Sequence, residues 1–246
     1  MRFDVAMLSK PGGRRYNEDA GGESMSERGC CLVLADGAGG HGGGDTAART
    51  AIHRILTDFA ASPSIDRDAL TEFVSAANAA VVDGQSTAPE LADMRTTLAM
   101  VAVDPATRCA AWCNAGDTRI YLFRSGRMIY RSRDHSVVQE MVDAGLLGPD
   151  APRTHPQRNV LTSGLGGGEV LLNLNEAPVP LFAGDVFLLC TDGFWEYVEE
   201  PDMERTLAES ADAASWIAAM EPVLLARVPP EHDNYTALAA WVVDVA

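Results

Sequence analysis

The chain has 246 residues, of which 47% are hydrophobic, and this length and composition predict one large domain or two small ones with a sizeable core. Its formal net charge of −16 at pH 7 predicts repulsion from nucleic-acid phosphates and from anionic membrane surfaces, so we expect neither nucleic acid nor membrane as a partner. The sequence has no run of eighteen apolar residues, which argues against a helix that spans a membrane.

The cysteines and the first residues bear on the compartment. The five cysteines are an odd number, they form no Cys-x-x-Cys pair, and they lie in apolar runs where free thiols behave as small core residues. Asp4 interrupts the N-terminal segment, where a signal peptide would be apolar. We therefore expect a cytoplasmic protein with reduced thiols.

Hydrophobic periodicity predicts the elements of the first third of the chain. Residues 2–9 alternate as a strand does, and the continuous apolar run 30–35 is typical of a buried strand. Residues 45–61 are predicted to form a helix with Asp45 as its N-cap, and residues 68–82 are predicted to form a second helix. One face of the second helix carries the apolar residues Leu70, Phe73, Val74, Ala77 and Val81.

From residue 96 the pattern changes to short strands. They are predicted over residues 96–103, 109–115, 118–123, 127–130, 186–190 and 236–245. Helices are expected over residues 136–144, 203–210 and 214–227, and the Gly- and Pro-rich residues 145–168 are expected to form an irregular surface flap. Strands in runs and helices in pairs favour antiparallel sheets covered by helices, which is an α+β fold.

Aspartates stand at the ends of the apolar strands. Asp36 and Asp192 each follow such a strand and precede a glycine, and Asp233 comes shortly before the last strand. In an antiparallel pair the end of one strand lies beside the start of its neighbour, so we expect these carboxylates to converge. Like charges held together in a partly desolvated place must protonate, separate or bind a cation. An all-oxygen set favours Mg²⁺ or Mn²⁺ over zinc, and Gly37 permits close approach of its carbonyl to an ion.

Each of these features also has a simpler interpretation. Asp-Gly is a common turn signal, so a single such pair is more often a hairpin than a metal ligand. Glu18, Asp19 and Asp117 are each compatible with an exposed turn acid or with an outer ligand that orients metal-bound water. Arg14 is compatible with an ordinary exposed arginine beside Arg15. The residues alone leave both interpretations open.

A series of motifs runs along the chain. They are RRYNED (14–19), LADGAGGHGGGDTA (34–47), RTTLAMV (95–101), NAGDTRIYL (114–122), DHS (134–136), HPQRNVLTSGLG (155–166), GDVFLLCTDGFWE (184–196) and DNYTALAAW (233–241). Together they resemble the metal-dependent protein phosphatases of the protein phosphatase 2C type, and the bacterial single-domain branch is the most similar. The resemblance implies one domain over residues 1–246, built as a four-layer α-β-β-α sandwich of two antiparallel sheets, with a flap at about 145–168.

The resemblance also implies a metal centre. Asp36 would bridge two divalent ions, either Mn²⁺ or Mg²⁺, and the Gly37 carbonyl would bind one of them. Asp192 and Asp233 would hold the other ion, and Asp117 with Asp192 would support a third. The ions would activate a shared water for in-line attack on phosphorus.

Further residues take their implied roles from the same motifs. Glu18 and Asp19 would contact metal-bound water, and the guanidinium of Arg14 would bind the substrate phosphate. The family's acid histidine directly follows the Asp-Gly pair, but here that position is Ala38, and His41 is expected to stabilise the glycine-rich loop. The general acid is therefore unassigned, with a metal-bound water as the default.

The flap is where we expect substrate selection, because a segment beside the site controls access to it. Ser163 stands there at a position where the family frequently has arginine, which would alter substrate contacts. His155 and Trp195 are expected to be structural.

The function implied is hydrolysis of phosphoserine and phosphothreonine in other proteins. We expect a monomer that opposes a bacterial serine/threonine kinase and counts that kinase among its substrates. The alternative is a catalytically weak regulatory module of the same fold that binds phosphoproteins. A nucleotide site is excluded at the glycine-rich stretch because no Gly-Lys-Ser/Thr follows it, and the scattered histidines disfavour a zinc hydrolase.

Overall fold

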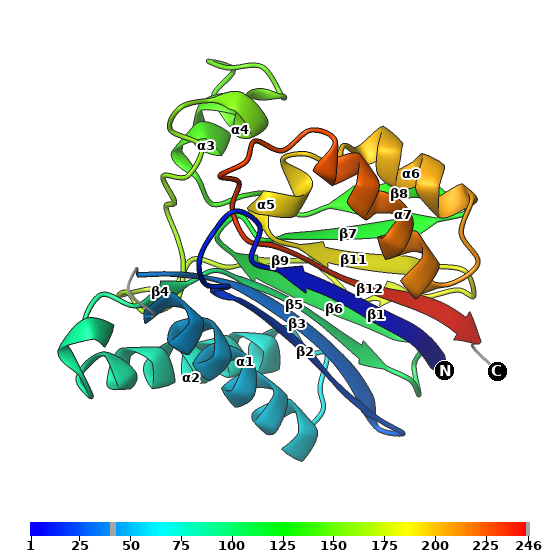
Figure 1. Cartoon of the computed structure of the whole chain (residues 1–246). Coiled ribbons are helices and arrows are strands. Elements are labelled where there is room, and N and C mark those ends of the chain that lie inside the picture. Colours follow the sequence, from blue (N-terminus) through cyan, green and yellow to red (C-terminus); the bar gives the residue numbers. More distant parts are fainter. Residues whose placement is uncertain (40–42, 245–246) are drawn as a thin grey trace.

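Two β-sheets face each other, and helices cover both outer faces (Figure 1). The structure is a computed structural model, and it describes residues 1–39 and 43–244. Every strand pairing within these residues is antiparallel. The predicted α+β, four-layer α-β-β-α sandwich is confirmed.

The first sheet joins the two ends of the chain to its middle. Its strand order is β1 (Arg2–Lys10), β12 (Tyr235–Asp244), β11 (Val186–Cys190), β7 (Arg119–Arg124) and β8 (Arg127–Arg131). The central strands β11 and β12 are continuous apolar runs because both of their faces are covered.

The second sheet has the order β10 (Val179–Pro180), β6 (Cys109–Ala115), β5 (Leu98–Asp104), β3 (Gly29–Ala38) and β2 (Asp19–Ser26). Two short strands extend it, since β4 (Arg95–Thr96) pairs with the end of β3 and β9 (Asn173–Leu174) pairs with β6.

The helices divide between the two outer faces. The second sheet is covered by α1 (Gly43–Ala61) and α2 (Arg67–Gln85), after which comes the short turn η1 (Pro89–Leu91). The first sheet is covered by α5 (Asp192–Trp195), α6 (Glu200–Ala208) and α7 (Ala213–Leu225). The remaining helices, α3 (Val137–Asp143) and α4 (Ala151–Thr154), stand outside the layers at one end of the sandwich (Figure 1).

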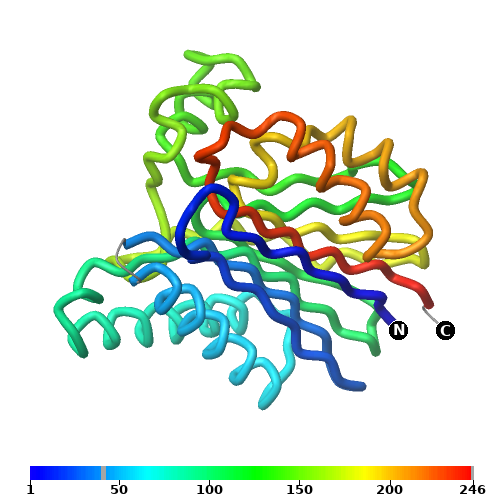
Figure 2. The backbone as a smooth tube through the Cα atoms, viewed as in Figure 1, coloured from blue at the N-terminus to red at the C-terminus, as the bar shows by residue number. Residues whose placement is uncertain are grey.

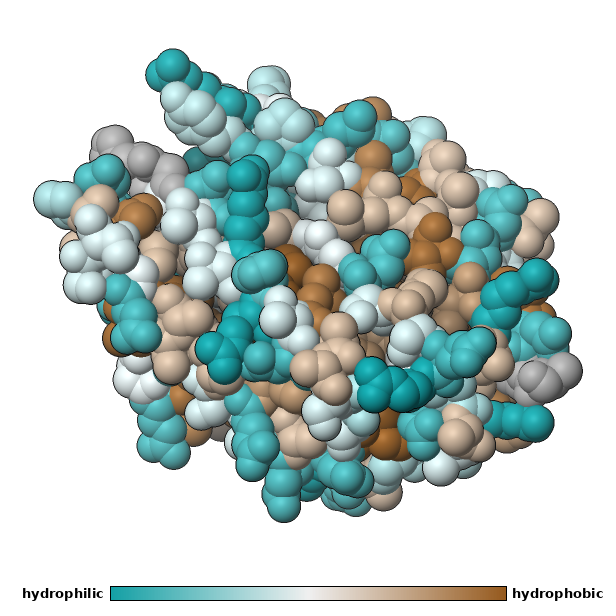
Figure 3. All heavy atoms as spheres, turned by 90° about the horizontal axis from the view of Figure 1, so that it is seen from below, coloured by the Kyte–Doolittle hydropathy of each residue, from teal (hydrophilic) through white to brown (hydrophobic). Residues whose placement is uncertain are grey.

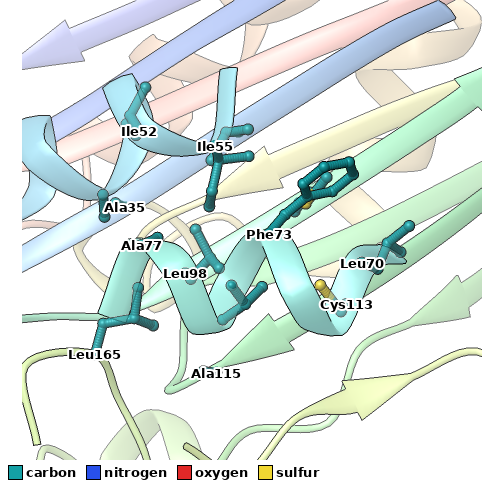
Figure 4. Close-up of a cluster of buried hydrophobic side chains, with 14 of the residues drawn as sticks. Ala35, Ile52, Ile55, Leu70, Phe73, Ala77, Leu98, Cys113, Ala115 and Leu165 are labelled. Atoms are coloured by element: carbon teal, nitrogen blue, oxygen red, sulfur yellow. The ribbon is translucent and has the colours of Figure 1, made fainter. Parts of the chain in front are cut away.

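The hydrophobic core consists of three clusters of buried side chains, each lying between two neighbouring layers. One cluster fills the space between the β-sheets, and the two others pack under the helices of each face. Figure 4 shows the cluster under α1 and α2, where Ile52, Ile55 and Phe73 from the helices meet Leu98 and Cys113 from the strands. Burial of such apolar area is the main stabilising contribution to a fold of this size.

Most of the predicted elements are confirmed, and for some of them the first and last residues are those predicted. The strands over 109–115 and 186–190 have the predicted bounds, and the five apolar residues predicted for one face of the second helix are the five buried residues of α2. Ser136 caps α3 by accepting a hydrogen bond from the backbone N–H of Gln139.

Several predictions of local structure were wrong. Asp45 is not the N-cap of α1, because that helix already begins at Gly43 and Asp45 lies in its first turn, paired with Arg49. Asp36 and Gly37 do not follow β3 but belong to it, and Asp192 opens the unpredicted helix α5. The predicted strand over 96–103 is divided into β4 and β5.

Among the described residues no helix has both the length and the apolar character needed to cross a membrane. The face seen from below the view of Figure 1 mixes hydrophilic and hydrophobic side chains over its whole area (Figure 3). Apolar side chains scattered over a surface in this way are ordinary and carry no functional meaning.

Candidate active site

A cavity of about 390 Å³ opens at the end of the sandwich where β3, β11 and the segment before β12 meet. Its walls come from segments far apart in sequence. The lining residues are Arg14, Arg15, Tyr16, Glu18, Asp36, Gly37, Ala38, Thr97, Asp117, Asn159, Leu161, Asp192, Asp233 and Asn234. The cavity therefore collects most of the acidic residues singled out by the sequence motifs.

The antiparallel register explains why Asp192 and Asp233 meet. Cys190 pairs with Ala237, so the residues just after β11 lie beside those just before β12. Asp36 reaches the same cavity from the other sheet, and not from a strand paired with theirs as we had predicted. The three aspartates thus meet across the sandwich rather than along one strand pair.

Burial raises the pKa of three carboxyls around this cavity, those of Asp36, Asp117 and Asp192. The pKa of Asp36 lies well above its usual range, first because of burial and then because of the neighbouring charge of Asp19. The pKa of Asp117 is raised well above its usual range by burial and then by Asp192. Burial and then the charge of Asp233 raise the pKa of Asp192. Each of these carboxylates is held in a place that disfavours its negative charge.

Asp19 lies behind the cavity wall, directly opposite Asp36 in the pairing of β2 with β3. Its Oδ2 accepts hydrogen bonds from Thr191 Oγ1 at 3.0 Å and Thr236 Oγ1 at 2.7 Å. Its Oδ1 is buried without a partner among the described residues. Burial is the main reason that the pKa of Asp19 is raised to about 7.

Arg14 brings the positive charge at the cavity mouth. Its Nη2 donates a hydrogen bond to Asp233 Oδ2 at 2.9 Å, with the two side chains 57% and 42% exposed. Figure 2 shows the loop between β1 and β2 lying beside the segment before β12, and the bond from Gly13 N to His232 O at 2.9 Å joins them. The guanidinium is therefore accessible to a ligand in the cavity.

Asn234 holds this loop in place, and the sequence analysis missed it. Its Nδ2 donates to the carbonyls of Pro11 and Tyr16, both at 2.8 Å, and its Oδ1 accepts from the Glu18 N–H at 2.8 Å. The only signal in the sequence was its place directly after Asp233 in the DNYTALAAW motif. Asn234 thus sets the position of Arg14 relative to the carboxylates.

Both glycines of the Asp-Gly pairs are required by close backbone packing. A Cβ on Gly37 would lie 2.1 Å from the carbonyl oxygen of Gly44, and one on Gly193 would lie 2.0 Å from that of Asn234. Glu18 also contacts Gly44, since its Oε1 accepts a hydrogen bond of 3.2 Å from the Gly44 N–H at the start of α1.

Hydroxyl groups support the inner wall. Thr97 Oγ1 accepts from the Asp36 N–H at 2.9 Å and lies 2.6 Å from Thr118 Oγ1. Trp195 is buried as predicted, and its indole N–H donates to the Asp117 carbonyl at 2.9 Å. These contacts fix the backbone on which Asp36 and Asp117 are mounted.

The cavity fits a divalent cation by charge and donor type. No three His, Cys, Asp or Glu side chains within residues 1–39 and 43–244 already stand in a metal-binding arrangement. The carboxyl oxygens nevertheless gather with raised pKa values, and one buried Asp19 oxygen has no described partner. A hard cation relieves such repulsion, and oxygen ligands suit Mg²⁺ and Mn²⁺.

Comparison with known proteins decides the family. The family model for protein phosphatase 2C matches residues 14–228. The chain belongs to the protein phosphatase 2C family. The match covers Arg14, the whole second sheet, the flap and the strands β7, β8 and β11 of the first sheet.

Relatives and solved structures of this family agree with the fold. The serine/threonine protein phosphatase PstP of Mycobacterium tuberculosis (strain CDC 1551 / Oshkosh) is 34% identical over 216 residues, 87% of this chain, which spans 40% of that relative's length. The serine/threonine phosphatase stp of Listeria innocua is 32% identical over 212 residues, covering 81% of this chain and 82% of the relative. The catalytic domain of PstP, solved in complex with two manganese ions, superposes with a TM-score of 0.80 and 29% identity over 98% of this chain and 99% of that one.

The predicted site residues either line the cavity, lie buried behind its wall, or lie outside the described residues. Lining the cavity are Arg14, Glu18, Asp36, Gly37, Asp117, Asp192 and Asp233. Asp19 is buried behind Asp36, and His41 lies outside the described residues. The flap reaches the cavity through Asn159 and Leu161, which the sequence analysis did not single out.

Proposed function

We propose that the chain is a serine/threonine protein phosphatase that hydrolyses phosphoserine and phosphothreonine in other proteins with the help of two Mn²⁺ or Mg²⁺ ions. The observation that carries the proposal is the gathering of carboxylates from both sheets around one cavity with an accessible arginine at its mouth. Membership of a metal-dependent family and the serine/threonine phosphatases among its relatives support the substrate class.

Asp36, the Gly37 carbonyl, Asp192 and Asp233 would hold the two ions. When bound, such ions act as Lewis acids and lower the pKa of water to near neutrality. The raised pKa values of Asp36 and Asp192 support these roles, because a cation would keep both ionised at neutral pH. Asp117 lines the cavity beside them and is our candidate for a third ion.

Arg14 would bind the substrate phosphate. Its fork of N–H donors matches two phosphate oxygens, and its present partner Asp233 is one of the proposed metal ligands. An ion bound by Asp233 competes with the guanidinium for the same carboxylate. Metal binding would therefore release Arg14 toward the phosphate and couple the two binding events.

The buried groups behind the cavity would orient the ligands. Asp19 is held by the hydroxyls of Thr191 and Thr236, and Glu18 is held by Gly44 N and by Asn234. Both would act through water on the ions rather than touch the substrate.

Turnover of p-nitrophenyl phosphate and of a phosphothreonine peptide tests the proposal. We expect hydrolysis of both with Mn²⁺ and complete loss with excess chelator. A folded protein that binds the peptide but shows no metal-dependent turnover would instead support a regulatory module that captures phosphoproteins.

We also propose a cytoplasmic monomer that opposes a serine/threonine kinase. The free thiols of all five cysteines support a reducing compartment. Light scattering of the pure protein tests the monomer. Dephosphorylation of a kinase from the same organism tests the partner.

A further inference from the structure

The flap, residues 145–168, forms one wall of the cavity. It follows α3, carries the short helix α4 and then runs back to the layers (Figure 1). Asn159 and Leu161 of this segment line the cavity, and Leu161 is 37% exposed. A phosphorylated side chain in the cavity would bring its flanking residues against this wall.

Backbone hydrogen bonds join the second half of the flap to the segment just before α3. Val137 N donates to Val160 O at 2.9 Å, and Thr162 N donates to His135 O at 2.9 Å. Between these bonds and α3, the segment is attached to the body of the protein by two arginine side chains. Arg153 donates to Glu200, and Arg158 donates to Glu196.

Of the two arginines, Arg153 is the less exposed. Its Nη2 lies 2.8 Å from Glu200 Oε2, and the two side chains are only 13% and 21% exposed. The other oxygen of Glu200 accepts from Tyr121 Oη at 3.3 Å and from Arg131 Nη1 at 3.4 Å. Glu200 thus joins the flap to the first sheet as well as to α6.

The same cluster continues to the cavity floor. The Arg119 guanidinium lies 4.0 Å from Glu200 and stacks over the Trp195 ring at 3.4 Å. Arg153 also faces this ring, at 5.7 Å, and the Trp195 indole N–H holds the Asp117 carbonyl. A side chain of the flap and a backbone group of the metal-binding wall therefore share one packed unit.

We propose that Arg153 and Glu200 are positioning residues that fix the flap, so that Asn159 and Leu161 form a preset wall for the residues flanking the phosphorylated side chain. This inference rests on the proposed function for its substrate class. A preset wall lowers the ordering cost of binding an extended substrate, whereas a small aryl phosphate has no flanking residues to use it.

The test compares Arg153→Ala with wild type on two substrates. We expect a roughly tenfold higher KM for a phosphothreonine peptide, with kcat changed less than about twofold, because one charge-assisted contact that fixes the wall is lost. Turnover of p-nitrophenyl phosphate should stay within about twofold of wild type, since the cavity itself is intact.

Two variants separate positioning from general stability. Arg131→Ala removes a more exposed arginine from the same Glu200 carboxylate and leaves the flap attached, so its peptide KM should match wild type. Arg153→Lys keeps the charge and should recover part of the lost affinity. Equal effects of Arg153→Ala on both substrates, or a lowered Tm with an unchanged peptide KM, would overturn the proposal.

Direct binding keeps this test independent of turnover. The affinity of a fluorescently labelled phosphothreonine peptide, followed by anisotropy, should fall about tenfold in Arg153→Ala whether or not wild type is catalytic. An unchanged affinity in Arg153→Ala would contradict the flap inference without affecting the phosphatase proposal. A weakened affinity in Arg153→Ala, together with no turnover by wild type, would contradict the phosphatase proposal and support the flap inference.

Discussion

Two groups of buried charge lie at the same end of the molecule and are built in opposite ways. Around the cavity, Asp36, Asp117 and Asp192 have raised pKa values, and the nearby Arg14 hydrogen-bonds to Asp233 instead of to them. The second group is the ion pair of Arg119 with Asp134, whose side chains are 1% and 2% exposed. The Arg119 guanidinium donates two parallel hydrogen bonds of 2.8 and 2.7 Å to the Asp134 carboxylate.

The difference lies in where the compensating charge comes from. The Arg119 guanidinium neutralises the Asp134 carboxylate through two hydrogen bonds, so this pair needs no ligand and contributes to the stability of the fold. The cavity carboxylates receive too little positive charge from the described residues, and the proposed ions would supply the rest. Removing a charge should therefore harm activity in the first group and stability in the second.

The largest expected effect is on catalysis at the cavity. Asp36→Asn and Asp192→Asn should each lower metal-dependent turnover by roughly 1,000-fold or more, because Lewis-acid stabilisation contributes several kcal/mol to the transition state. The metal-free Tm should not fall in either variant, since each removes a destabilised charge. Steady-state kinetics and calorimetry measure the two quantities.

Asp68→Asn is the matched control, because Asp68 is exposed on α2 and does not line the cavity. Its turnover should equal that of wild type. Wild-type turnover in either cavity variant would remove that residue from the metal centre.

The second expected effect is on stability at the paired cluster. Asp134→Asn leaves the Arg119 guanidinium buried without its carboxylate partner, so the free energy of unfolding should fall by about 3–5 kcal/mol. Urea denaturation measures this loss. Added Mn²⁺ should not restore the difference from wild type, and a restoration would show that the two groups are not separate.

Arg14→Ala should have an intermediate effect on catalysis alone. Loss of a charge-assisted contact to phosphate should lower kcat/KM by roughly 10- to 100-fold, mainly through KM. The free energy of unfolding should change by less than about 1 kcal/mol, because the Arg14–Asp233 pair is half exposed. Unchanged KM and kcat would contradict the phosphate role.

The smallest expected effect is a pH dependence of stability. The pKa of Asp19 is about 7 in the folded protein against a usual value of 3.8, so the folded state binds this proton more tightly than the unfolded state. Its stabilising contribution is fully present below about pH 4 and is lost as the pH rises through about 7. The Tm of the metal-free protein should therefore fall as the pH rises over this range.

Asp19→Asn isolates this contribution. The variant should show a flatter decline of Tm with pH in chelator, and Mn²⁺ should raise the Tm of wild type more at pH 8 than at pH 6. Identical pH profiles for wild type and variant would place the titrating group elsewhere.

The apolar runs and helical periods determined most of the elements by themselves. The strands over Cys109–Ala115 and Val186–Cys190 and the buried face of α2 followed from local patterns, since burial of a strand or helix face leaves its own period in the sequence. β2 left no such pattern, because DAGGESMS is polar and glycine-rich and becomes a strand only by pairing with β3.

The acidic residues of the candidate site were also visible in the sequence, because strand-end aspartates and a family resemblance marked them. Only the tertiary structure decided that Arg14 pairs with Asp233 across 219 positions, that Thr236 holds Asp19 across 217, and that the flap reaches the cavity. Local patterns record the period at which a segment is buried, but they do not record which distant segment supplies its partner. That choice depends on strand register and side-chain packing between the layers.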